Sequence, residues 1–595
     1  MADAQGPKPS NYDAYVEAEF NRPEFYPIEQ TLNPRLYRPV APWIGRLLLP
    51  AEDQRDTIGG VLFEVYHAPE AHRALIGHTI YLRWARDDET QRRVARSRYT
   101  VVFGADARQS RDAGQIVPTR IDGWIDVDPL ESLAANHPLD DILVYLEEPS
   151  LEPGALDRPA ALYIRHDPIQ ISAPYYALVR IEGRTAPGSD LFTVTHFNRE
   201  SGQFDGPQET LRFPDIVRDM NTVRNSTMDD IEKSPVNPGG WYVYGAQDRA
   251  GQFTVRALAP RDLLSLRADR VISDPKAGRR YIIKQLWEDS EKKKGQIEKT
   301  LVAPGSSGDA AALAAWQEGE RGLLLHVYGG IGGQKAEPAA KFFVYWGHFA
   351  YGFADVVREP LTDELRFDIV YHQVYAQNVD GVIAGAIHWS HYLGDRQFGW
   401  LGTRPVADTI VRLPGLTETY TSNLGDWNPL DTIRDNLETI TARYRVGDGS
   451  GATFATAAYS CSQDASQAMF DAITEVEDRI LEDPAPIVAL AMDPAQATRL
   501  QDLMGVQHDI KDKMSFLWQT RQDWKDDPEV YGKGFDDGAV RNFLTGLGSF
   551  RMMLPPVAYR SVMDVLLKYQ AQAFVLRTNQ VGGWDPEIAP VAPNV

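Results

Sequence analysis

The sequence contains a single cysteine, Cys461, among its 595 residues. One cysteine excludes an intramolecular disulfide framework and any metal site built from cysteines alone. It also fits a reducing compartment, because disulfides persist mainly in oxidising ones. We therefore expect a cytoplasmic protein whose one thiol is not in an intramolecular disulfide.

Basic residues are also fewer than acidic ones. The chain has 61 lysines and arginines against 83 aspartates and glutamates, which gives a formal net charge of −22. Proteins that bind nucleic acid need a basic face to displace the counterions of the phosphates. The charge balance therefore argues against DNA or RNA as the main partner.

Long apolar runs are missing as well. Residues 1–20 show no basic segment followed by an apolar one, so nothing indicates a secretory signal. The strongest apolar stretch begins at Phe342, and its histidine and aspartate keep it below the roughly 18 uncharged apolar residues of a membrane span. We expect no transmembrane segment, and a location in the cytoplasm or at the cytoplasmic face of a membrane.

The residues that are present suit a folded protein. Hydrophobic residues make up 43% of the chain and aromatic residues 10%, which is enough to build a core. A chain of this length exceeds one core and should divide into roughly three or four domains. The sequence predicts an α+β multidomain protein, with N-terminal domains resembling a β-barrel or sandwich, a mixed β core and a helical C-terminal region.

Turn residues and hydrophobic periodicity divide the chain into five segments. Residues 1–57, rich in proline, tyrosine and asparagine, predict an extended arm that lies on a surface. The others are a β-rich domain (58–230), a second β module (231–305), a mixed β core (306–485) and a helical region (486–595). Apolar residues repeat at helical spacing over 469–480 and 500–517, and a third helix is expected from Pro555 through Ala573.

Cys461 provides the sharpest candidate site. Ser460 stands three residues before Gln463, a capping-box pattern that places Cys461 in the first turn of a helix. Unpaired N–H groups and the positive end of the helix dipole stabilise a thiolate at such a position. The sequence therefore predicts a nucleophilic cysteine, which also needs a base and a group that orients the base.

Two histidines on neighbouring predicted strands supply a base and an orienting group. If Val357 pairs with Leu365 across an antiparallel hairpin, His348 and His372 lie diagonally on the same face. A slip of one residue would separate them. In this hypothesis His348 deprotonates Cys461 and His372 orients His348; Gln373 or Asn378 could replace His372.

Residues 320–485 resemble the circularly permuted papain-like hydrolases, including the lecithin retinol acyltransferase type. The resemblance rests on the segments GHFAYG, YHQVY and SCSQDASQAMF and on the order of histidine, polar residue and cysteine. It implies that Cys461 attacks an acyl carbon and that His348 later protonates the leaving group. Backbone N–H groups around Cys461 would form the oxyanion hole.

Structural explanations compete with each of these assignments. A free cysteine is commonly a buried core residue, and a histidine on a strand is commonly one too. His388, His391 and Asp395 have spacing that could bind a divalent metal, but no third histidine or cysteine has ligand spacing nearby. We expect no metal and no cofactor. The glycines of residues 328–335 are expected to let another backbone approach, because no phosphate-loop motif is present.

A second resemblance covers nearly the whole chain. Segments such as HFNRESGQFDGPQE, IEKSPVNPGGWYVYGAQDRAGQFTVRAL and LRTNQVGGWDPEIAP resemble the large soluble region of cyanobacterial proteins described as predicted Abi/CAAX-type membrane proteases. The protease label of that family belongs to a membrane domain with a Glu-Glu-x-x-x-Arg motif, which this chain lacks. The resemblance implies a soluble module that works at, or with, a membrane protein in a photosynthetic bacterium.

Two functions follow from the sequence. The first is a thiol hydrolase or acyltransferase acting on an amide, ester or thioester through Cys461, His348 and His372. The second is a non-catalytic scaffold or binding module of a membrane-associated complex. The environment of Cys461 distinguishes the two, because an enzyme needs its thiol within hydrogen-bond reach of His348.

Overall fold

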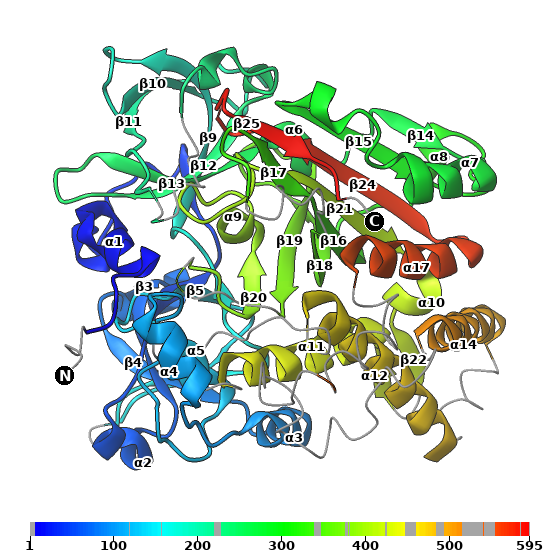
Figure 1. Ribbon diagram of the computed structural model, residues 1–595, viewed down its shortest axis with the longest axis horizontal. Helices are drawn as coiled ribbons and strands as arrows, with labels where there is room; N and C mark the ends of the chain where they lie inside the picture. The colour runs from blue at the N-terminus through cyan, green and yellow to red at the C-terminus, as the bar shows by residue number, and fades with distance from the viewer. Residues whose placement is uncertain are drawn as a thin grey trace.

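The computed structural model describes residues 6–117, 119–155, 158–218, 220, 228–337, 347–374, 379, 381–422, 425–446, 460–482, 493–514, 540, 554–583 and 585–593. These residues form helices and several β-sheets, which confirms the predicted α+β class (Figure 1). Within these ranges no helix has both the length and the apolar character that a membrane crossing requires.

A 15-stranded sheet runs through the molecule. Its central strands pair antiparallel in the order β24 (Gln572–Asn579), β21 (Pro405–Arg412), β16 (Arg321–Tyr328), β18 (His348–Arg358) and β19 (Leu365–Gln373). On one side the sheet continues through β15 (Gln296–Val302) to β14 (Arg270–Ile272). On the other it continues through β20 (Gly385–His388), β8 (Ile169–Gln170), β5 (Leu143–Leu146), β2 (Trp43–Leu48), β3 (Val61–His67), β4 (Thr79–Trp84), β7 (Ala161–Ile164) and β6 (Ser150–Glu152). Strands from the N-terminal third therefore extend the sheet of the central core.

A small closed barrel stands on one face of this sheet. Its strands are β9 (Tyr175–Arg184), β10 (Leu191–His196), β11 (Gln208–Arg212), β13 (Phe253–Pro260) and β12 (Trp241–Gln247), and β12 pairs again with β9. Strand β1 (Tyr37–Pro39) joins the edge of β9. The predicted barrel or sandwich is present as a barrel, whose strands come from both sides of residue 230. The strands within residues 58–164 belong instead to the 15-stranded sheet.

Helices cover the opposite face of the central sheet (Figure 1). They are α11 (Pro429–Val446), α12 (Cys461–Glu482), α14 (Pro494–Met514) and α17 (Pro555–Lys568). Their apolar side chains pack with Leu325, Phe349 and Tyr351 of the sheet in one core. A second core joins the other face of the sheet to the barrel through residues such as Leu324, Tyr371 and Tyr176. Burial of both faces explains why these strands read as nearly continuous apolar runs.

Several local predictions differ from the structure. Residues 281–285, inside the predicted second β module, form a π-helical turn after α7 (Pro275–Arg280). The predicted arm contains a short helix, α1 (Asn11–Glu17), and β1 and β2 already begin before residue 57. After α17 the chain returns to sheet as β24 and β25 (Ile588–Val591). Helix α11 was not predicted.

The glycine segment after β16 behaves as expected. Strand β17 (Gly330–Gly333) pairs with β25, and a Cβ on Gly333 would stand 2.4 Å from the carbonyl oxygen of Glu587. Only glycine lets the two backbones approach this closely. The glycine segment thus allows β25 to pair closely with β17.

Candidate functional site

Cys461 begins α12, as the sequence predicts. The Ser460 side-chain oxygen accepts the backbone N–H of Gln463 at 3.3 Å, which is one half of the predicted capping box. The thiol itself lies against the first residues of β18, where it accepts a hydrogen bond from the backbone N–H of Phe349.

The thiol is not the thiolate that the helix start led us to expect. Burial raises the pKa of Cys461 to about 11, and the backbone hydrogen bonds from Phe349 and Ser462 lower it by less. A protonated thiol is a poor nucleophile near neutral pH. Desolvation therefore outweighs the helix terminus at this position.

The register of β18 and β19 separates the two predicted histidines. Leu365 pairs with Arg358 and not with Val357, and His372 pairs with Tyr351. This is a shift of one residue from the expected pairing, and a shift of one residue reverses which side chains share a face. His348 lies on the barrel side and His372 on the helix side, so the assignment of His372 as the group that orients His348 is wrong.

Gln373 takes the place of His372 beside His348. His348 Nε2 lies 2.6 Å from Gln373 Oε1, and the imidazole stacks on Tyr328 with ring centroids 5.2 Å apart. Burial lowers the pKa of His348 to about 3, so the ring is neutral. Among the described residues no hydrogen bond joins His348 to Cys461. Asn378, the other alternative, lies outside the described residues.

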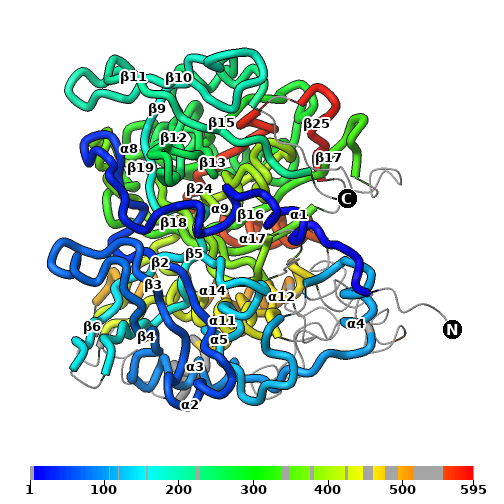
Figure 2. Tube along the Cα trace, turned by 90° about the vertical axis from the view of Figure 1, so that its left-hand side faces the viewer, coloured from blue at the N-terminus to red at the C-terminus, as the bar shows by residue number. Residues whose placement is uncertain are grey.

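A cleft lies where the barrel, the N-terminal strands and the arm meet. In Figure 2 the dark blue arm crosses the molecule between the barrel above and strands β2–β6 below. The cleft is lined by aromatic side chains of Tyr26, Tyr66, Tyr175 and Phe398 and by Arg256. The cavity volume available to water-sized molecules is about 110 Å³. The empty space between the walls of the cleft, including its open mouth, is about 1000 Å³.

Ser172, His391 and Asp395 meet in this cleft. Ser172 Oγ lies 3.1 Å from His391 Nδ1 and also donates to the Asp395 carboxylate, which lies 3.6 Å from the same Nδ1. A hydrolytic triad needs its serine and its aspartate on different nitrogens of the imidazole. The three residues therefore cannot relay a proton from the serine, and in the described part of the chain every hydrogen bond of His391 uses Nδ1.

Asp395 is held firmly in this arrangement. Its Oδ1 accepts the backbone N–H groups of Gln397 and Phe398 at 2.8 and 3.0 Å. Burial alone would raise the pKa of Asp395, but the contact with His391 and the charge of Arg256 hold it below its ordinary value. The ionised carboxylate fixes the orientation of the His391 ring, so that Nε2 remains for an occupant of the cleft.

A second histidine and aspartate pair lines the same cleft. His137 Nδ1 lies 3.0 Å from Asp141 Oδ1, and the hydroxyl of Tyr12 donates to Asp141 Oδ2 at 2.6 Å. His137 Nε2 is buried and has no hydrogen-bond partner among the described residues. Sequence reasoning missed this pair, although its i, i+4 spacing matches that of His391 and Asp395.

His388 does not join His391 and Asp395. Its Nε2 pairs with Asp368 at 3.0 Å, and its Nδ1 lies 2.7 Å from Ser390 Oγ. These partners use both ring nitrogens, so His388 is a satisfied residue of the sheet junction.

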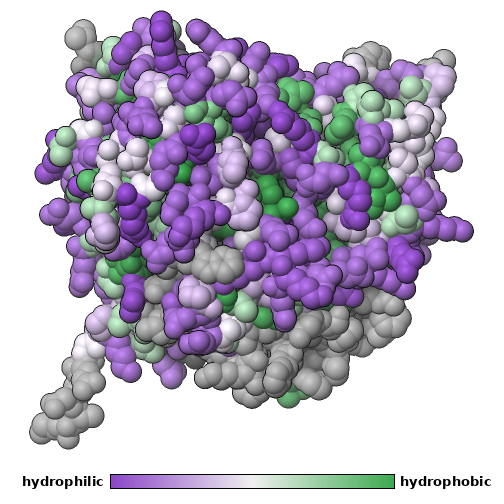
Figure 3. Space-filling model, turned by 90° about the horizontal axis from the view of Figure 1, so that it is seen from above, coloured by the Kyte–Doolittle hydropathy of each residue, from purple (hydrophilic) through white to green (hydrophobic). Residues whose placement is uncertain are grey.

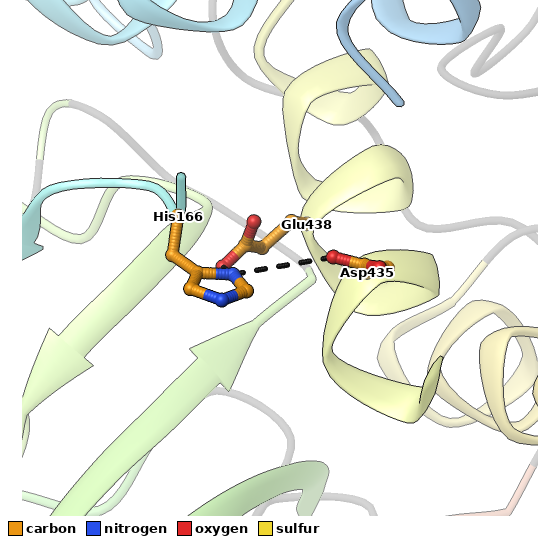
Figure 4. A group of neighbouring side chains, drawn as sticks. All are labelled: His166, Asp435 and Glu438. Carbon is orange, nitrogen blue, oxygen red and sulfur yellow. Dashed lines mark ion pairs between the residues drawn. The ribbon is translucent and has the colours of Figure 1, made fainter. Parts of the chain in front are cut away.

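A third cluster joins the N-terminal strands to helix α11. His166, which follows β7, lies with its Nδ1 3.3 Å from Glu438 Oε1 and 4.0 Å from Asp435 Oδ1 (Figure 4). Asp435 and Glu438 are three residues apart and share a helix face, which is the one signal that the sequence offers for this cluster. The sequence analysis did not single out these residues.

No family model matches the chain, and no curated protein and no solved structure matches it.

Proposed function

We propose that this protein is a binding module that holds a small organic ligand, with an aromatic ring and an anionic group, in the cleft under the N-terminal arm. The observation that carries the proposal is the lining of the cleft, which combines aromatic rings with a partly buried arginine. Ligand sites are typically concave and mainly apolar, with a few polar groups that fix orientation. The interior volume is close to that of an engineered cavity of about 150 Å³ that binds benzene.

Arg256 is the group that favours an anionic ligand. Its guanidinium donates to the carbonyl oxygen of Phe20 and the hydroxyl of Tyr15, both at 2.6 Å, and both acceptors are neutral. Among the described residues it forms no salt bridge, although the charge of Asp395 acts on it. A carboxylate or sulfonate on a ligand would supply a direct partner for this partly buried cation.

His391 favours a ligand with a hydrogen-bonding group. It pairs with Asp395 through Nδ1, which leaves Nε2 for an occupant of the cleft. An imidazole nitrogen can offer a donor or an acceptor. A polar group of the ligand can thus be recognised beside Asp395, whereas Nε2 of His137 is buried.

Fluorine NMR tests this proposal with 4-fluorobenzoate and its neutral analogue 4-fluorobenzamide. We expect saturable line broadening at one site, with tighter binding of the benzoate. Ile28→Trp, in the arm that lines the cleft, should weaken binding at least tenfold. Ile125→Trp, at an exposed isoleucine, should not change it. Equal binding by both variants, or no saturable binding of either compound, would contradict the proposal.

The thiol hydrolase or acyltransferase is the second candidate function. It is supported by the position of Cys461 at a capped helix start beside the strand that carries His348. The protonated thiol and the pairing of His348 with Gln373 weigh against it. The thiol reaction predicted from the resemblance is therefore less well supported than the binding function.

Association with a membrane protein remains a prediction of the family resemblance. Large hydrophobic residues that are exposed are few and dispersed among the described residues: Val102, Ile125, Leu139, Met220, Met504 and Val540. On the face drawn in Figure 3, hydrophobic residues occur in separate groups between hydrophilic ones. A polar contact surface fits such a partner better than a broad apolar one.

A further inference from the structure

The cluster of His166, Asp435 and Glu438 lies away from the cleft and has a different chemistry. His166 and Asp435 are partly exposed, with 30% and 25% of their side chains open to solvent, whereas Glu438 is 1% exposed. One imidazole nitrogen and two carboxylates converge from two separate parts of the fold, the segment after β7 and helix α11 (Figure 4). We propose that these three side chains bind one divalent first-row metal ion.

The spacing of the ligand atoms fits such an ion. Metal–ligand bonds of about 2.0–2.2 Å in a tetrahedral site place neighbouring ligand atoms roughly 3.4 Å apart. The 3.3 Å between His166 Nδ1 and Glu438 Oε1 agrees with this separation. The 4.0 Å to Asp435 Oδ1 is longer, so a bound ion would require the partly exposed carboxylate of Asp435 to rotate toward His166.

Unpartnered buried nitrogens support the assignment. His166 Nδ1 is buried and has no hydrogen-bond partner among the described residues. His372 Nδ1 is in the same situation, its residue is 1% exposed, and its strand β19 contacts α11.

Two arginines adjoin the cluster and do not block it. Arg434 Nε donates to Glu438 Oε1 at 2.9 Å. Arg93 contacts Glu438 Oε2, and its Nε lies 3.7 Å from Asp435 Oδ1. A carboxylate has about four lone-pair sites, so Glu438 can accept both arginines and still bind a metal. Partners of this kind orient metal ligands in many sites.

The ligand set also indicates the class of ion. One imidazole with two carboxylates suits zinc, manganese or iron(II), and cobalt(II) can report on the same ligands by its visible absorption.

A metal at this place would join the N-terminal strands to the helical layer, because His166 and α11 belong to different parts of the fold. Binding to the folded state alone stabilises a protein in proportion to the logarithm of the ligand concentration over its Kd. We therefore expect the ion to raise the temperature of unfolding.

The experiment uses untagged, full-length protein that has been dialysed against EDTA and then titrated with cobalt(II). We expect one bound ion per chain, a visible ligand-field spectrum and a higher Tm. His166→Ala and Asp435→Asn should each weaken binding at least tenfold. Asp431→Asn, an exposed position on the same helix that also pairs with an arginine, and His508→Ala should leave binding unchanged.

Absence of binding, or binding that His166→Ala and Asp435→Asn do not weaken, would overturn the inference. Glu438→Gln is avoided because it removes a buried partner of two arginines. Circular dichroism shows whether the variants are folded, and binding of 4-fluorobenzoate reports on the cleft separately. A failure of the metal site therefore leaves the proposed function in place.

Discussion

Cys461 illustrates how burial decides the chemistry of a single residue. Its position at a capped helix start could be read from Ser460 and Gln463, and the structure confirms it. The sequence could not show that the thiol lies against the backbone of Phe349, because that contact depends on how α12 packs against a strand 112 residues earlier in the chain. Desolvation raises the cost of the thiolate more than the helix terminus lowers it.

Labelling with a chloroacetamide probe at pH 6.5 should therefore be slow in the native protein and fast after unfolding. The raised pKa of Cys461 leaves almost no thiolate at this pH. Mass spectrometry of the peptide that contains Cys461 measures the rate. Fast labelling of the folded chain, at a rate above that of free cysteine, would restore the thiol enzyme as the leading function.

Asp435 gives a second test at this scale. Its pKa is about 6 in the folded protein and should return to about 3.8 on unfolding, so the folded state binds the proton more tightly. The stabilisation that this proton provides is complete below pH 3.8 and is lost as the pH rises through 6.

In the metal-free protein, Asp435→Asn should therefore increase the free energy of unfolding at pH 7.5 by about 1–3 kcal/mol. The gain should shrink as the pH approaches 4, and Asp431→Asn should show no such pH dependence. Urea denaturation at the two pH values measures both. A loss of stability at pH 7.5 would show that the Arg93 contact outweighs burial.

At the scale of elements, the pattern of apolar residues and turn signals predicted the strands but not their register. The stretch between β18 and β19 admits two pairings that differ by one residue. The turn selects between them: Glu359 Oε2 accepts the backbone N–H groups of Leu361 and Thr362 at 2.9 and 2.7 Å, and Asp363 has a φ of 66°. Turn geometry of this kind sets the register of a hairpin. It also explains why Gln373, and not His372, reaches His348.

The arm is the element whose attachment can be measured most simply. Tyr15 accepts a hydrogen bond from Arg256 and packs against Phe398, with ring centroids 4.7 Å apart. Tyr15→Phe keeps the packing and removes one hydrogen-bond acceptor from the partly buried Arg256. We expect a loss of about 1–2 kcal/mol in the free energy of unfolding.

Tyr163→Phe is the matched control, since Tyr163 accepts from the exposed Arg86 at the surface. We expect this variant to change the free energy of unfolding by less than about 0.5 kcal/mol. Urea denaturation compares the two. Equal effects would mean that the arm is not anchored through Arg256.

At the scale of the whole molecule, composition and spacing predicted an α+β protein, a barrel and a helical layer. They could not predict that one sheet joins the N-terminal and central strands, because β8 and β20 are distant in sequence and meet through a single pair, Ile387 and Gln170. Ser172 follows β8 and His391 follows β20, so this junction brings them together. The cleft is a product of tertiary structure, and the paired histidines that line it could not be recognised as neighbours beforehand.

A crystal soaked in 4-iodobenzoate tests the binding function most directly, because the iodine marks its own position by anomalous scattering. The proposed function predicts one strong iodine peak inside the cleft, among Tyr26, Tyr66 and Phe398, with the carboxylate directed at Arg256. Iodine bound at other places while the cleft holds only water would contradict it.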